Sequence, residues 1–419
     1  MKLFAGRRIL APMDTLAPHL TAAELTALES KYGAPNYAPI DVVITSASGV
    51  WAHDIDGKRY LDCISAYSAV NQGHGHPRIL AALIEQAKRL TLTSRAVRND
   101  QMPLLLRDLT AYCEQEMAIL MNTGAEAVET AIKLARRWGY RIKGIPLNRA
   151  RIIVCLGNFH GRTTTVVSAS SVQQYRTDFG PFTPGFDLVP YGDIDALRRA
   201  FTDETCALLI EPIQGEGGVI VPPPGYLKAA MALCRERHAL FLDDEIQTGF
   251  GRCGDRLAVD HDGIKPDVVM VGKALGGGFY PVSAVLASRE LLELFKAGDH
   301  GSTFGGNPLG CAVAREALAV IVDEHLAERS RTLGAELMAR IEGLKHPLVR
   351  EVRGRGLLIG IELTVPAKYV SKALLREGIL AKDTQDTVLR IAPPLVIERA
   401  QLEVIVTALS RALDAVAAA

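Results

Sequence analysis

Cysteine, long apolar runs and an excess of either charge are all scarce in this sequence. Its 419 residues include only seven cysteines, an odd number without any CxxC pair, which argues against a disulfide framework and against structural zinc. No apolar run approaches the roughly 18 uncharged residues that a membrane span requires. The sequence therefore predicts a soluble protein of a reducing compartment.

Charge is balanced, because 47 Lys and Arg residues accompany 47 Asp and Glu residues. A net charge of zero provides no basic face for nucleic acid or anionic lipid, so small molecules are the expected partners. The apolar stretches around Lys2, Arg7 and Arg8 are too short for a signal peptide and would allow at most a weak transit sequence. We expect a cytoplasmic location.

The sequence does contain short apolar runs that alternate with amphipathic stretches between about residues 120 and 290. The strand-like runs are RIIVCL, CALLIEP, HALFLDDE, DVVMVGK and SAVLAS. Helical spacing is clearest over residues 126–140 and 226–238. This pattern predicts an α/β fold with a mainly parallel sheet between helices.

The two chain ends differ from this middle part. A hairpin is indicated where Asp56 and Gly57 separate two alternating runs. Helical patterns cover residues 308–329 and 333–344, and a last helix is expected from Glu398. We predict a large domain over residues 71–315, with residues 1–70 and 316–419 contributing to a smaller α+β domain.

Lys273 lies between an apolar strand and a glycine-rich segment in DVVMVGKALGGG. A half-buried lysine at a sheet edge can lose its proton and attack an aldehyde, and glycines let a ligand approach the backbone. The alternative is a lysine that ends a solvent-exposed strand. This segment alone does not separate the two interpretations.

Asp243, Asp244 and Glu245 end another apolar strand, with no basic residue before Arg252. A buried carboxylate at a strand end needs a cationic partner, and a protonated pyridine ring is one such partner. A solvated turn or a metal site is the more common role of an acidic loop. The acids therefore need support from other motifs.

A possible phosphate site comes directly before the helical run at residue 126. Small residues, Gly124 and Ala125, leave the first helix amides open, and these amides can hold a phosphate together with the helix dipole. Thr123 and Glu126 also have the spacing of an ordinary capping box, which is the more frequent explanation.

The loop GNFHGRT carries Phe159 and Arg162 after a further strand. Phe159 could stack on a flat ring, and Arg162 could bind a carboxylate through two parallel hydrogen bonds. A core aromatic beside a surface arginine is the usual case. His74 and His76 have no third ligand nearby in the sequence, so we expect a turn there and no metal site.

These motifs follow one another in the order phosphate, ring, acid and lysine, and together they resemble the class III aminotransferases. The resemblance extends over about residues 32–409 and implies the fold type I architecture, with pyridoxal 5'-phosphate (PLP) as cofactor and a homodimer as the functional unit. Segments such as KYGAPNYAP, SAYSAVNQGHGHP, EPIQGEGG, DEIQTG and HGSTFGGNPLG are similar to the bacterial branch that acts on ornithine.

The resemblance assigns cofactor roles to individual residues. Lys273 is expected to bind PLP covalently and then to shuttle the reacting proton. Asp244 is expected to face the pyridine nitrogen, Gln247 the phenolic oxygen, and Phe159 the ring plane. The phosphate would be held by Gly124 and Ala125 and, from the partner subunit's HGSTFGG loop, by Ser302 and Thr303.

The resemblance also implies the substrates. Tyr37 and Arg162 are expected to bind the α-amino and α-carboxylate groups of L-ornithine, with Tyr67 lining the pocket, so that the terminal amine reaches the cofactor. Glu216 and Arg390 would be paired while ornithine is bound and would separate to let Arg390 receive 2-oxoglutarate. The implied products are glutamate 5-semialdehyde and glutamate, in arginine degradation or proline biosynthesis.

Two alternatives stay open. A class III transaminase for N-acetylornithine or 4-aminobutyrate would share every cofactor residue, although an acetylated α-amine would have no use for the polar group of Tyr37. A non-catalytic sensor of PLP or an amino acid would not need both Lys273 and Asp244.

The sequence departs from the ornithine branch at Gly218, Asp243, Cys253 and Gln385. Asp243 matters most, because it places a second carboxylate beside Asp244. Alternation along the strand should turn Asp243 away from the cofactor ring.

Overall fold

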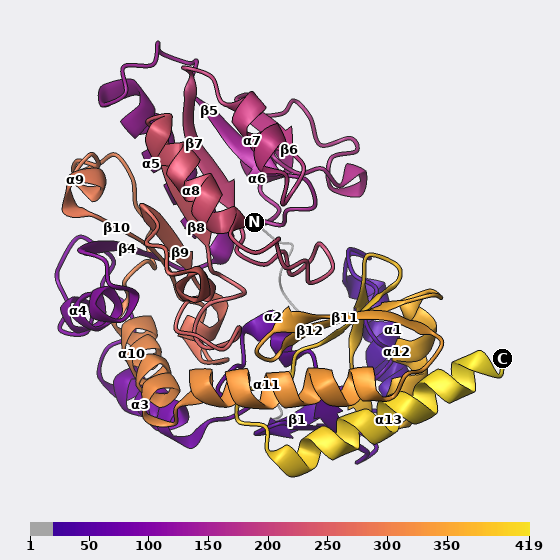
Figure 1. Cartoon of the computed structure of the whole chain (residues 1–419). Helices are drawn as coiled ribbons and strands as arrows, with labels where there is room; N and C mark the ends of the chain where they lie inside the picture. Colours follow the sequence, from indigo (N-terminus) through magenta and orange to yellow (C-terminus); the bar gives the residue numbers. More distant parts are fainter. Residues whose placement is uncertain (1–19) are drawn as a thin grey trace, which may run out of the picture.

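The computed structural model describes residues 20–419, so the basic segment around Arg7 and Arg8 lies outside the described residues. A large sheet occupies the upper part of Figure 1 and two smaller sheets lie below it. None of the described helices is both long and apolar enough to cross a membrane.

The large sheet has seven strands in the order β4-β10-β9-β8-β7-β5-β6. Their bounds are β4 Met117–Met121, β5 Arg151–Cys155, β6 Phe186–Val189, β7 Thr205–Ile210, β8 Leu240–Asp244, β9 Val268–Val271 and β10 Ser283–Ala287. The five strands from β5 to β9 pair in parallel, as the alternating pattern predicts.

Strand β10 runs antiparallel to both of its neighbours, β9 and β4. It follows β9 through residues 272–282, which contain only the short 3-10 turn Lys273–Gly276. A parallel return needs a crossover of about a dozen residues or more, usually with a helix, and this connection is too short to provide one. The SAVLAS run is therefore a strand of opposite direction in a mainly parallel sheet.

Both faces of the large sheet are buried, and successive residues of a strand pack into different cores. Ile152 and Val154 of β5 pack with helix α5 (Gly124–Arg141), whereas Ile153 packs with the core that contains α8 (Tyr226–Glu236). Residues that alternate between two covered faces explain why the strands are continuous apolar runs. The loops at the carboxyl ends of the strands are left to form the site.

The remaining helices surround these sheets. Their bounds are α1 Ala22–Tyr32, α2 Ser65–Ser68, α3 Pro77–Arg89, α4 Met102–Cys113, α6 Thr164–Ser168, α7 Ile194–Ala200, α9 Arg289–Leu292, α10 Pro308–Asp323, α11 Leu326–Gly343, α12 Ala367–Arg376 and α13 Arg399–Ala417. The expected break between residues 329 and 333 was wrong. The chain turns at His325, whose φ is 52°, and the helical periodicity simply resumes on the other side.

The two smaller sheets combine distant parts of the chain. The predicted hairpin is formed by β2 (Trp51–Asp54) and β3 (Arg59–Asp62), with β1 (Ile44–Ser48) beside β2. β13 (Ile379–Leu380) pairs in parallel with β3. The last sheet has the order β11-β12-β15-β14, with bounds Val349–Arg355, Leu358–Leu363, Val388–Ile391 and Lys382–Thr384. N-terminal and C-terminal segments thus share a sheet, while the domain boundaries themselves stay a prediction.

Candidate active site

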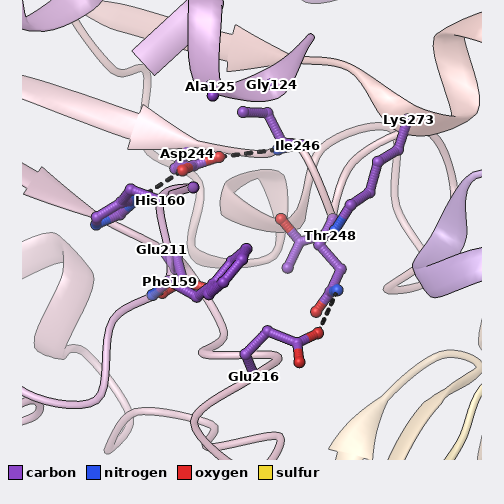
Figure 2. A pocket seen from close by; sticks show the side chains of 12 residues that line it. Gly124, Ala125, Phe159, His160, Glu211, Glu216, Asp244, Ile246, Thr248 and Lys273 are labelled. Atoms are coloured by element: carbon purple, nitrogen blue, oxygen red, sulfur yellow. Dashed lines mark hydrogen bonds and ion pairs between the residues drawn. The ribbon is translucent and has the colours of Figure 1, made fainter. Parts of the chain in front are cut away.

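A cavity opens at the carboxyl ends of the central strands, where Glu211 follows β7, Asp244 ends β8 and Lys273 follows β9 (Figure 2). The lining residues are Gly124, Ala125, Phe159, His160, Gly161, Glu211, Glu216, Asp244, Ile246, Gln247, Thr248 and Lys273. Parallel strands present their carboxyl ends at one edge of a sheet, so polar residues from separate segments meet there.

Lys273 extends its side chain into this cavity from the first position of the 3-10 turn (Figure 2). Its φ of 42° lies in the left-handed region, which a lysine adopts only when the surrounding structure imposes it. Burial lowers the pKa of Lys273 to about 8. A substantial share of the amine is therefore neutral near physiological pH and able to act as a nucleophile or a base.

Asp244 is oriented by His160. The imidazole Nδ1 lies 2.7 Å from Asp244 Oδ2 and donates to it, because the carboxylate only accepts. Burial would lower the pKa of His160, but the bond to Asp244 outweighs this effect and the pKa lies above its usual value. The Ile246 amide donates to the other carboxylate oxygen over 3.2 Å. Asp244 is thus fixed at the cavity wall.

Glu211 is a further acid in the cavity, beside Asp244 and Glu216, and the sequence motifs did not single it out. Burial raises the pKa of Glu211 to about 7, and one of its oxygens accepts a hydrogen bond from the Phe159 amide over 2.9 Å. The sequence contains a pattern that could have identified Glu211. In CALLIEP this acid directly follows an apolar strand, and in HALFLDDE Asp244 occupies the corresponding place at a strand end.

The start of α5 serves both as a capping box and as an open helix terminus. Thr123 and Glu126 cap each other, and the Glu126 carboxylate accepts the amides of Asn122 at 2.9 Å and Thr123 at 2.7 Å. The next two residues, Gly124 and Ala125, line the cavity. The capping box and the phosphate site are compatible interpretations of this motif. The Glu126 carboxylate binds the amides of Asn122 and Thr123, which precede the helix, and the first helical residues still line the cavity.

The HGSTFGG loop is tied to the same helix. His300 Nε2 lies 2.7 Å from Thr130 Oγ1 of α5, and Asn122 donates to Ser302 Oγ over 2.8 Å. Thr303 is exposed and does not line the cavity of its own chain. Its predicted role in the partner subunit's site stays a prediction.

Glu216 joins two further residues of the predicted site. Arg390 NH1 donates to Glu216 Oε1 over 2.6 Å, and Gln247 Nε2 donates to the same oxygen over 3.1 Å. Burial would raise the pKa of Glu216, but Arg390 and Lys273 hold it below its usual value. Gln247 Oε1 is buried without a hydrogen-bond partner within the described residues.

Of the residues expected to bind the amino donor, Tyr67 and Tyr37 lie near this ion pair and Arg162 lies beside Phe159, and none of the three lines the cavity. Arg390 packs over the Tyr67 ring with its guanidinium carbon 4.7 Å from the centroid. Burial raises the pKa of Tyr67, and the nearby Glu216 and Tyr37 add to this effect. Tyr37 itself is 80% exposed. Arg162 lies over the Phe159 ring at 5.8 Å.

Asp243 does not line the cavity, as alternation along β8 predicts. Both of its carboxylate oxygens are buried and have no hydrogen-bond partner within the described residues. Burial, together with the charges of Glu245 and Asp244, raises the pKa of Asp243 well above its usual value. Burial without a partner and the raised pKa both favour the neutral form of this carboxyl group.

The cavity residues fit a pyridoxal phosphate cofactor. A helix terminus lies at one end, a fixed carboxylate at the wall, and a partly neutral lysine across from it. Gln247 lines the cavity, and its Oε1 has no hydrogen-bond partner within the described residues, so it can accept a hydrogen bond from a ligand. No cluster of three or more metal-ligating side chains occurs in residues 20–419.

The class-III aminotransferase family matches residues 32–413. The chain belongs to the class-III aminotransferases. An ornithine aminotransferase from Brevibacillus brevis is 54% identical over 89% of this chain and 94% of its own length. A solved ornithine aminotransferase from Toxoplasma gondii, described with partial occupancy of PLP at its active site, is 45% identical with a TM-score of 0.93 over 95% of each chain.

The structure of an acetylornithine aminotransferase from Elizabethkingia anophelis is also similar to this class-III aminotransferase, with 43% identity and a TM-score of 0.87 over 95% of this chain and 100% of that chain.

Proposed function

We propose that this class-III aminotransferase moves the terminal amino group of L-ornithine to 2-oxoglutarate, giving glutamate 5-semialdehyde and glutamate by a ping-pong mechanism. The observation that carries the proposal is the ion pair between Arg390 and Glu216 beside Lys273. While Glu216 neutralises Arg390, the cavity can accept a cationic amino donor. When the ion pair opens, Arg390 can bind a carboxylate of a dicarboxylate substrate.

PLP would be held by the first-turn amides of α5, the Asp244 carboxylate, Gln247 and the Phe159 ring. When bound, it supplies an aldehyde that takes up the amino group and a ring that withdraws electrons from the reacting carbon. His160 keeps the Asp244 carboxylate pointed into the cavity. A carboxylate at this place favours a protonated pyridine nitrogen.

Lys273 is the residue for proton transfer. Its amine lies inside the cavity, and its lowered pKa lets Nζ take a proton from the substrate carbon and return it. The nearby charges of Glu216 and Asp244 favour the protonated form that this step produces.

Substrate selection would depend on residues at the cavity mouth. Arg162 would bind the α-carboxylate of ornithine and Tyr37 the α-amino group, with Tyr67 filling the wall between them and Arg390. This arrangement would keep the α-amine away from Lys273 and present the terminal amine instead.

N-acetylornithine is the second candidate donor, because an aminotransferase for it is similar to this chain at 43% identity. A panel of L-ornithine, N-acetylornithine and 4-aminobutyrate with 2-oxoglutarate, with identification of each product aldehyde, separates the candidates. We expect ornithine to give the largest kcat/KM. A larger value for either other donor would replace the proposed function with that activity.

We also propose a homodimer in which the partner subunit's Thr303 completes the phosphate site. The exposed position of Thr303 outside its own cavity supports this arrangement. Sedimentation and assay at the same dilution test it, and a fully active monomer would exclude it. The cytoplasmic location stays a prediction.

A further inference from the structure

Arg162 is held by an aromatic residue that lies outside the cavity. Its guanidinium carbon lies 3.9 Å from the centroid of the Tyr175 ring, against 5.8 Å for the Phe159 ring. Within residues 20–419 Arg162 makes no hydrogen bond or ion pair, so the Tyr175 face is the contact that orients its charged group.

Tyr175 also contacts the cavity aromatic directly. The rings of Phe159 and Tyr175 meet edge to face, with centroids 6.1 Å apart and an interplanar angle of 80°. This is a favourable geometry for two aromatic rings. One ring therefore connects the residue expected to stack on the cofactor with the residue expected to bind the substrate carboxylate.

The backbone that carries Tyr175 is anchored independently of Arg162. Tyr175 ends the 3-10 turn Gln173–Tyr175, and the next residue, Arg176, donates to the carbonyls of Ser168 at 2.7 Å and Ser170 at 3.1 Å. Arg176 also packs over Phe182, 4.3 Å from its centroid. Tyr175 is thus a fixed surface against which a long flexible side chain is placed.

We propose that Tyr175 is a positioning residue for donor specificity: its ring holds the Arg162 guanidinium ready for the α-carboxylate of the amino donor. The inference rests on the proposed function, in which Arg162 binds that carboxylate. An arginine side chain has many rotamers, and a ring that selects the binding one lowers the entropy lost when substrate binds. Tyr175 acts through Arg162 and does not touch the reacting atoms.

Three donors separate this role from a general structural one. L-Ornithine and 5-aminopentanoate both carry the carboxylate, whereas 1,4-diaminobutane has the same reacting amine without it. In the holoenzyme, Tyr175→Leu should raise the KM for the two carboxylate donors about two- to thirtyfold, the range of a cation–π contact, with kcat nearly unchanged. The kcat/KM for 1,4-diaminobutane should stay within about twofold.

Tyr175→Phe is the matched control, because it keeps the ring face and removes only the hydroxyl group. It should retain the wild-type preference for carboxylate donors. Phenylalanine analogues with increasing ring fluorination keep the shape of the side chain and progressively weaken the face that attracts a cation, so they test the contact even if the leucine variant does not fold. The carboxylate preference should fall with each added fluorine, and an unchanged preference across that series would overturn the proposal.

Arg162→Ala distinguishes a failure of this inference from a failure of the proposed function. If Arg162→Ala leaves the preference for carboxylate donors intact, the assignment of Arg162 itself is wrong. If it removes the preference while Tyr175→Leu does not, only the role of Tyr175 is wrong. The expected result is that both variants reduce it and that Tyr175→Leu adds nothing in the Arg162→Ala background, since residues that act as a unit are not additive.

Discussion

Arg390 donates to the Glu216 carboxylate over 2.6 Å, and the Arg390 side chain is only 3% exposed. The Glu216 side chain is 27% exposed, so the cost of leaving Arg390 without its partner should lie toward the lower end of the range of about 2–5 kcal/mol for buried pairs. A substrate carboxylate that takes the place of Glu216 recovers part of this energy. We therefore expect Glu216→Ala to raise kcat/KM for glutamate relative to ornithine by about one to two decades. Single-turnover measurements of the two half-reactions give the ratio.

Glu216→Gln and Arg390→Ala are the comparisons for this experiment. The Glu216→Gln substitution removes the charge but keeps an amide oxygen as an acceptor for Arg390, so a smaller shift is expected. Arg390→Ala should weaken 2-oxoglutarate and spare the ornithine half-reaction. Equal losses in both half-reactions for either alanine variant would mean that the pair is structural.

Lys273 should make cofactor capture by the apoenzyme depend on pH. Only the neutral amine attacks an aldehyde, and burial lowers the pKa of Lys273 to about 8. The rate of capture should rise about tenfold per pH unit between pH 6 and 7 and level off above pH 8. Rapid mixing with PLP, followed by visible absorbance, measures it. A flat rate over this range, or covalent capture by Lys273→Ala, would contradict the assignment.

Asp243 should make the protein less stable as pH rises. The pKa of this buried carboxyl is raised in the folded state, so stability present below the unfolded pKa of about 3.9 is lost progressively up to the folded pKa. Asn cannot titrate. As pH rises through that window, the unfolding free energy of Asp243→Asn minus that of wild type should therefore increase by up to about 1.4 kcal/mol per pH unit.

Thermal unfolding of the holoenzyme from pH 5 to pH 8 tests this behaviour. Asp195→Asn at an exposed position on α7 provides the control, because it makes the same chemical change without affecting a buried carboxyl group. A constant difference in unfolding free energy between Asp243→Asn and wild type across the range would show that Asp243 has the same pKa in the folded and unfolded states.

Arg252 should be essential for holding separate parts of the chain together. It is fully buried without a carboxylate partner in the described residues, and it donates to Asn71 Oδ1 and to the carbonyls of Leu357 and Pro393. Arg252→Met leaves these acceptors unpaired and should destabilise the protein by about 3–5 kcal/mol. Exposed Arg237→Met is the control.

Hydrogen exchange locates the effect of Arg252→Met. Faster exchange should appear around residues 357 and 393, where the carbonyl contacts are lost, while the central strands keep their protection. Wild-type stability in the methionine variant would show that the buried guanidinium is dispensable.

Local sequence patterns account for the sheet-edge chemistry of this protein. Lys273, Asp244 and Gly124 each adjoin a recognisable strand or helix, and the carboxyl ends of parallel strands share one edge, so their meeting in the cavity follows from those patterns. The capping residues of α5 and the hairpin at Asp56 were predictable for the same reason, because short-range hydrogen bonds determine them.

Features that depend on distant segments come only from the packing of the whole chain. Glu216 and Arg390 are 174 positions apart, so no local pattern pairs them, and only the family resemblance implied the contact that the structure shows. The antiparallel direction of β10 is also not encoded in its apolar pattern. The unpartnered state of Asp243 and the stacking of Arg162 on Tyr175 are likewise invisible in the sequence. Apolar periodicity specifies which face of an element is buried, but only the packed chain specifies which side chains from other elements lie against a given polar group.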